Sequence, residues 1–72
     1  MDIEELRIGQ RVEVISYYTG PYTGTVSAVH EKIGPTDCPP EDERPGVSLR
    51  GCEGNPSQLT WAYAEQIVRV IG

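Results

Sequence analysis

Few side chains in this sequence could carry chemistry: one histidine, two cysteines and scattered serines. His30 follows a strand-like segment and has Glu31 beside it. Neighbouring residues of a strand point to opposite faces, so His30 and Glu31 cannot act together as an acid–base pair. We therefore expect His30 to be an exposed residue at the end of a strand.

The serines and glycines show no catalytic or phosphate-binding pattern. No serine stands in a Gly-x-Ser-x-Gly context. The stretch from Gly20 to Gly24 precedes a strand-like segment, whereas a phosphate-binding glycine loop opens a helix. The sequence predicts a protein that is not an enzyme and holds no cofactor.

The two cysteines, Cys38 and Cys52, do not form a Cys-x-x-Cys pair. With a single histidine in the chain there is no metal-ligand spacing, and we expect no metal site. We expect two reduced thiols, and a disulfide between them is the open alternative. A disulfide would close the long loop between the cysteines and add about 2–3 kcal/mol to stability.

Aromatic side chains are the feature that suggests binding. Tyr17, Tyr18 and Tyr22 fall in one Tyr/Gly/Pro-rich loop, and Trp61 and Tyr63 fall before the last turn. Such rings supply rigid contact area for a protein or peptide. We expect these five residues to form a binding surface, with Tyr18 and Tyr22 exposed. For Trp61 alone we favour a place in the core, because the chain has no phenylalanine.

The elements that must position these side chains are strands, marked by alternation of apolar and polar residues. Val12 and Val14 predict the first strand, and Val26 and Ala28 predict the second. The expected order is a helical turn over residues 3–7, strands over 11–16, 25–33, 47–50 and 59–61, a turn over 62–66 and a last strand over 68–71.

Glycine, proline and capping residues complete this prediction. Gly24 suits a positive φ just before the second strand, and residues 51–57 suit a turn. Residues 34–46 are rich in proline and acids, and we expect a long exposed loop without strand or helix. Asp2 and Glu5 fit a capping box, with Leu6 and Ile8 across one end of the fold; a frayed terminus is equally open.

Size and charge restrict the partners. Seventy-two residues make one domain with a small core, so self-association as a homodimer is an open route to stability. The net charge of -5 and six scattered basic residues weigh against nonspecific nucleic-acid binding. There is no transmembrane-length apolar stretch, no basic amphipathic helix and no signal-peptide pattern, so we expect a cytoplasmic protein with no membrane partner.

The order of motifs resembles that of the SH3-like small β-barrels. It runs from Gly9-Gln10-Arg11-Val12, through Gly24-Thr25-Val26 and a long loop, to the closing Ala64-Glu65-Gln66-Ile67-Val68-Arg69-Val70. The resemblance covers residues 1–72 and implies one five-stranded barrel with a single helical turn before the last strand. It supports a fold more than a function.

Three branches of that superfamily offer different functions. The Gly20-x-x-x-Gly24-x-Val26 spacing is similar to a KOW motif, which implies a nucleic-acid or ribosome-associated module. The closing segment is also similar to the small SH3-like accessory protein of photosystem I, which implies docking of a ferredoxin-like protein. Gln58-Leu59-Thr60-Trp61 lies where type II dihydrofolate reductase has its pore-lining strand, which implies NADPH binding. A non-enzymatic protein-binding module is the favoured hypothesis.

Overall fold

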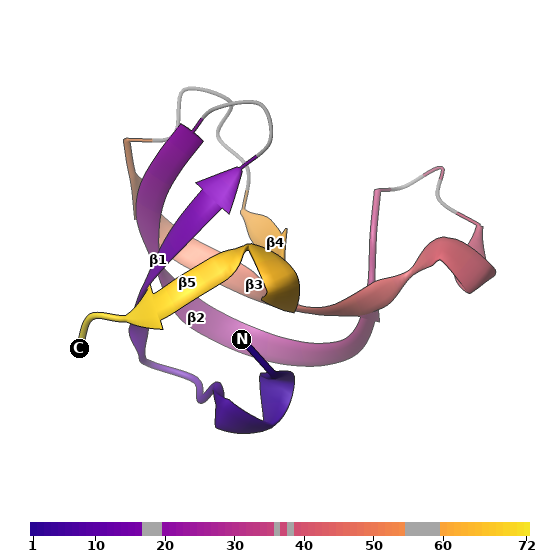
Figure 1. Ribbon diagram of the computed structural model, residues 1–72, viewed down its shortest axis with the longest axis horizontal. Helices are drawn as coiled ribbons and strands as arrows, with labels where there is room; N and C mark the ends of the chain where they lie inside the picture. The colour runs from indigo at the N-terminus through magenta and orange to yellow at the C-terminus, as the bar shows by residue number, and fades with distance from the viewer. Residues whose placement is uncertain (17–19, 36, 38, 55–59) are drawn as a thin grey trace.

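The computed structural model describes residues 1–16, 20–35, 37, 39–54 and 60–72. Within these residues, five strands form one antiparallel sheet in the order β4-β3-β2-β1-β5 (Figure 1). The strands are β1 (Arg11–Ser16), β2 (Gly20–Ile33), β3 (Arg44–Glu53), β4 (Trp61–Tyr63) and β5 (Ile67–Val70). Three short 3-10 turns accompany them: η1 (Ile3–Glu5), η2 (Pro40–Asp42) and η3 (Ala64–Gln66). The all-β prediction is confirmed.

The sheet curls strongly but stays open. The four strands β1 to β4 follow one another as neighbours, and β5 returns to pair with β1. The two edge strands, β4 and β5, are separated in sequence only by the three residues of η3, so the chain itself holds the edges near each other. Among the described residues no strand pairing joins β4 to β5. The expected closed barrel is therefore an open, curled sheet (Figure 1).

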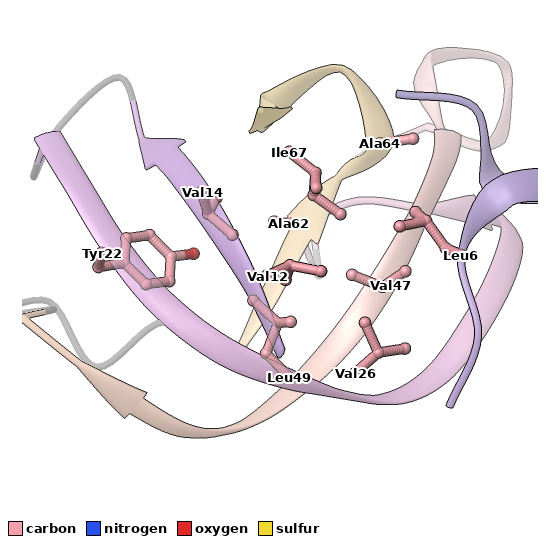
Figure 2. Packing of buried hydrophobic residues seen from close by; sticks show 10 residues of the cluster. All are labelled: Leu6, Val12, Val14, Tyr22, Val26, Val47, Leu49, Ala62, Ala64 and Ile67. Atoms are coloured by element: carbon pink, nitrogen blue, oxygen red, sulfur yellow. The ribbon is translucent and has the colours of Figure 1, made fainter. Parts of the chain in front are cut away.

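The core lies inside this curl (Figure 2). The predicted inward positions Val12, Val14 and Val26 are fully buried. On β3, Val47 and Leu49 are buried while Ser48 and Arg50 are not, as period-two alternation requires. Burial of the alternating residues is the main favourable term for so small a domain. The buried hydrophobic cluster comprises Leu6, Val12, Val14, Tyr22, Val26, Val47, Leu49, Ala62, Ala64 and Ile67.

Two expected loops are shorter than predicted. The connection predicted over residues 17–24 is already strand from Gly20 on, and the 34–46 loop gives way to strand at Arg44. Gly20 has φ +74, so the positive φ predicted at Gly24 occurs four residues earlier. Gly24 instead lies in β2, where an added Cβ would approach the Cys52 Sγ to 3.1 Å and the Leu49 Cβ to 3.3 Å. Gly24 therefore suits this position because the neighbouring side chains leave little room for a Cβ.

Other boundaries move for similar reasons. β3 continues beyond the predicted Arg50 to Glu53, with Gly51 at φ +60 where the sequence predicts a turn. The helical turn predicted over 62–66 is confined to η3, because β4 continues to Tyr63. Leu59, the predicted start of the fourth strand, lies outside the described residues. Pro40, within the expected structureless loop, begins η2, where proline is tolerated in a first turn.

The predicted N-terminal capping box is wrong. The η1 turn forms, but the Asp2 side chain makes no capping hydrogen bond. Leu6 packs into the core, whereas Ile8 is 69% exposed and does not cover the end of the sheet. The helical elements that the structure describes are three-residue turns, and none of them could cross a membrane.

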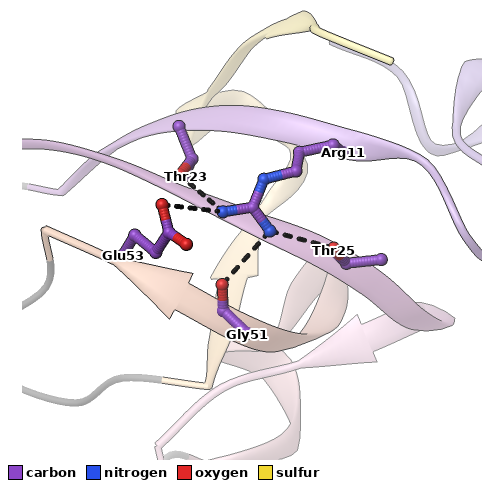
Figure 3. Close-up of polar contacts among 5 residues, drawn as sticks. All are labelled: Arg11, Thr23, Thr25, Gly51 and Glu53. Carbon is purple, nitrogen blue, oxygen red and sulfur yellow. Dashed lines mark hydrogen bonds and ion pairs between the residues drawn. The ribbon is translucent and has the colours of Figure 1, made fainter.

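Arg11 holds three strands together on the face opposite the core (Figure 3). Its guanidinium donates to the Thr25 Oγ1 at 3.1 Å and the Thr23 Oγ1 at 3.0 Å, both on β2. It also donates to the Gly51 carbonyl at 3.2 Å and lies 3.5 Å from the Glu53 carboxylate, both on β3. Most of these partners are uncharged, so the cluster acts mainly through hydrogen bonds.

Candidate binding site

A cavity of about 1020 Å³ opens beside β4. Three of the five predicted aromatic residues line it: Tyr22, Trp61 and Tyr63. Tyr17 and Tyr18 lie outside the described residues. The remaining lining residues are mostly small or uncharged: Ser16, Ser27, Ile33, Gly34, Pro35, Arg44, Ser48, Leu49, Thr60 and Gln66.

Trp61 and Tyr63 form an aromatic pair on β4. Ala62 between them is buried, so alternation turns both rings to the other face of the strand. Their centroids lie 5.1 Å apart at an interplanar angle of 83°, the edge-to-face arrangement that aromatic quadrupoles favour. Both residues are only partly buried. The preferred core position for Trp61 is therefore wrong, because Ala62 takes the inward position.

Tyr22, predicted to be exposed, is instead a core residue. It pairs with Val14 across β1 and β2, and both side chains point into the interior (Figure 2). Only 3% of Tyr22 is exposed, and burial, followed by the neighbouring Cys52, raises the pKa of its phenol. The prediction fails because the loop expected around Tyr22 is strand. Tyr22 is thus a buried residue that also lines the cavity, not part of an open surface.

Arg44 contacts the aromatic pair through the Tyr63 ring. Its guanidinium lies 4.8 Å from the centroid of the Tyr63 ring, within cation–π range. The same guanidinium is paired with the Glu65 carboxylate on η3. Among the described residues that line the cavity, Arg44 is the one with a charged side chain, and Glu65 already balances that charge. The cavity therefore suits uncharged groups that stack on rings and accept hydrogen bonds.

His30 and Ser48 form a polar contact on the same face. The His30 Nε2 lies 2.8 Å from the Ser48 Oγ, and Ser48 lines the cavity. His30 is half-buried and not exposed as predicted, because it pairs with Gly46 of β3 and its imidazole contacts Ser48 of that strand. In the described part of the chain no carboxylate contacts His30, so nothing orients the imidazole as a general base. The pair positions the Ser48 hydroxyl.

The cavity is lined from both faces of the sheet near β4, an edge strand. Tyr22 and Leu49 belong to the core face, whereas Ser48 and its strand partner Trp61 lie on the opposite face. The Leu49 N–H donates to the Thr60 carbonyl at 2.6 Å, so the backbone N–H and C=O of Trp61 point away from β3, toward the open edge. An extended segment could therefore pair with Trp61 and place alternate side chains on both sides of β4.

The Gln66 side chain marks where this open edge ends. The Tyr63 N–H, two residues further along the edge, donates to the Gln66 Oε1 at 3.0 Å. Gln66 thus accepts a hydrogen bond from the outward N–H of Tyr63, whereas the outward N–H of Trp61 lies beside the cavity. A segment pairing with this edge would have to begin at Trp61.

The residues that the structure describes hold no cluster suited to a metal ion. No three of the described His, Cys, Asp and Glu residues cluster in a way that could hold a metal ion. Cys52 carries a free thiol. Partial burial raises the pKa of this thiol, and the nearby positive charge of Arg11 opposes that increase. Cys38 lies outside the described residues, as do Gln58 and Leu59 of the stretch compared with type II dihydrofolate reductase.

Sequence reasoning missed Arg44, Ser48 and Gln66 as site residues. Arg44 falls inside the segment predicted to be loop, and no local signal ties it to Tyr63. Ser48 falls within the strand predicted over 47–50, but its pairing with Trp61 depends on the register of β3 and β4. The fourth strand is predicted to end at Trp61, and no alternation of apolar and polar residues signals its continuation to Tyr63.

The chain matches no protein family, no curated protein and no solved structure.

Proposed function

We propose that this protein is a non-enzymatic, SH3-like module that binds an extended segment of another protein in the cavity beside β4. The observation that carries the proposal is the Trp61–Tyr63 pair, partly exposed at a cavity of about 1020 Å³. Partly exposed tryptophan and tyrosine in a concave site are the residues most often found as binding hot spots.

The order of the elements supports the SH3-like assignment. Four strands follow one another as neighbours, a 3-10 turn of three residues separates β4 from β5, and β5 returns to β1. This order matches the arrangement that the sequence resemblance implies. Small barrels and curled sheets of this kind host many unrelated functions, so the site and not the fold carries the functional argument.

The charge of the lining favours protein over nucleic acid as the partner. Phosphate backbones are recognised by several lysines and arginines acting together. Arg44 is the single cation in the described lining, and its ion pair with Glu65 neutralises it. Uncharged hydroxyl and aromatic groups suit the backbone and side chains of a peptide instead.

The experiment is selection of binders from a library of random peptides, with counter-selection against the Trp61→Ala variant. We expect enriched peptides that bind the wild type and lose at least about thirtyfold in affinity with Trp61→Ala, the minimum loss for a hot-spot ring. Arg50→Ala is the matched control, because Arg50 is exposed on β3 and does not line the cavity. Circular dichroism checks that each variant is folded.

Two outcomes would count against the proposal. One is the absence of any enriched peptide. The other is a set of peptides whose affinity is the same for the wild type and the Trp61→Ala variant, which would locate binding on another surface.

A further inference from the structure

Most of the large apolar residues that are exposed gather at one side of the sheet. Among the described residues, four of the five lie in, or directly after, the paired strands β1 and β5: Ile15, Val68, Val70 and Ile71. The fifth, Ile8, precedes β1 and is not part of this group. On β5 and just after it, Val68 is 46% exposed, Val70 38% and Ile71 48%. Neighbouring apolar residues left in water at a sheet edge usually mark an interaction surface.

The backbone of β5 also faces outward at this edge. The Ile71 N–H donates to the Arg11 carbonyl at 2.7 Å, and Arg69 pairs with Glu13. Backbone groups of alternate residues point to the partner strand in an antiparallel ladder. The N–H and C=O of Val70, between Ile71 and Arg69, therefore point away from β1 and toward the open edge.

Charge does not oppose the approach of two copies at this side. The chain carries eleven acidic residues and a net charge of -5. The segment from Ile67 to Gly72 contains none of these acids, and β1 contains one, Glu13. The Glu13 carboxylate lies 3.3 Å from the Arg69 guanidinium, so this edge is close to neutral. Elsewhere the acidic surface of one copy would oppose the acidic surface of another.

We propose that β5 pairs with β5 of a second copy, antiparallel and across a twofold axis. The outward groups of Val70 fix the register, because two residues that exchange both hydrogen bonds must both point across the interface. Val70 then faces Val70 of the second copy, and Arg69 faces Ile71 rather than another arginine. The contact is isologous and closes after two copies. It buries the apolar edge and joins the two sheets into one.

The test is sedimentation velocity of the whole chain from micromolar to millimolar concentration. We expect the wild type to shift with concentration from the 7.9 kDa monomer to twice that mass. Val70→Lys would place two like charges opposite each other, and we expect it to weaken the dimer at least about tenfold.

Ile8→Lys is the matched control, since it adds the same charge at an exposed isoleucine. The neighbouring Gly9 N–H bonds to Val26 of β2 at 2.8 Å, which places this segment on the β2 side. A wild type that stays monomeric throughout, or a dimer that Val70→Lys leaves intact, would overturn the proposal. Dimerisation lost in Trp61→Ala but kept in Val70→Lys would also overturn it, by assigning the contact to the cavity. If the dimer forms but no peptide binds, the proposed dimer stands and only the proposed peptide-binding function is contradicted.

Discussion

Among the glycines whose surroundings the structure describes, Gly46 leaves the least room for an added methyl group. It is buried on β3, opposite Tyr63 of β4. A Cβ at this position would overlap the Ala62 carbonyl oxygen, approach the Ile33 Cγ2 to 2.5 Å and approach the Tyr63 Cα to 3.1 Å. Two of these three neighbours are backbone atoms of a paired strand, so relief requires β4 to move. We therefore expect Gly46→Ala to be strongly destabilising.

The expected cost follows from these contacts. Overpacking a close-packed site costs about 1–3 kcal/mol, and backbone neighbours favour the upper half of that range. A domain of this length has a total stability of about 4–11 kcal/mol. A loss of about 2–3 kcal/mol would lower Tm by roughly 10–20 °C. Because β4 carries Trp61 and Tyr63, its displacement would also weaken peptide binding at the cavity.

Thermal and urea unfolding followed by circular dichroism measure this effect. Two further glycines give a graded control series. An added Cβ at Gly72 meets nothing within 4 Å, so Gly72→Ala should leave stability unchanged. At Gly24 the nearest neighbour is the Cys52 side chain at 3.1 Å, which can shift, and Gly24→Ala should be intermediate. A Gly46→Ala variant within about 0.5 kcal/mol of the wild type would refute the packing argument.

Two other predictions concern the titratable side chains of Tyr22 and Cys52, and Arg11. Burial raises the pKa of the Cys52 thiol above its ordinary value of 9.0 and that of the Tyr22 phenol above 10.0. The unfolded chain therefore loses these protons at a lower pH than the folded chain does. The free energy of unfolding is highest below about pH 9 and falls as pH rises further. Urea midpoints should show this fall, and Tyr22→Phe should reduce it. Arg11→Gln should cost about 1 kcal/mol, because it removes hydrogen bonds to three strand positions while its ion pair with an exposed glutamate contributes little. Arg50→Gln should change stability by less than about 0.5 kcal/mol in the same assay, and equal effects of the two variants would contradict the assignment.

Alternation predicts the strands whose pattern is clear. Five strand residues lie in the core as alternation predicts, because one face of a strand must be apolar to be buried. They are Val12, Val14, Val26, Val47 and Leu49. The turn before the last strand is also predicted, though it is shorter than expected. In each case the information lies within a few consecutive residues.

The failures occur where partners distant in sequence decide the structure. Tyr22 is surrounded by glycine, proline and threonine, which locally indicate a loop, yet pairing with Val14 makes it a buried strand residue. Proline and glycine before Val47 likewise suggest a loop, but pairing with Ile33 and β4 extends β3 to Arg44. Propensity is a weak guide where such pairing overrides it.

The candidate site is predicted in part for the same reason. Trp61 and Tyr63 are identified from residue type alone, because exposed aromatic rings suit binding. The contacts that shape the site, Arg44 with Tyr63 and Ser48 with His30, join residues 19 and 18 positions apart in the chain. Only the register of β2, β3 and β4 brings these side chains together.

The most direct test of the proposed function uses Trp61 as its own reporter, since it is the sole tryptophan of the chain. The measurement is the fluorescence of Trp61 during titration with a peptide from the selection, together with quenching by acrylamide. We expect a saturable change in emission and protection of Trp61 from the quencher, with both effects weakened by Tyr63→Ala. Saturable peptide binding that leaves the emission and the quenching of Trp61 unchanged would contradict the assignment of the cavity as the binding site.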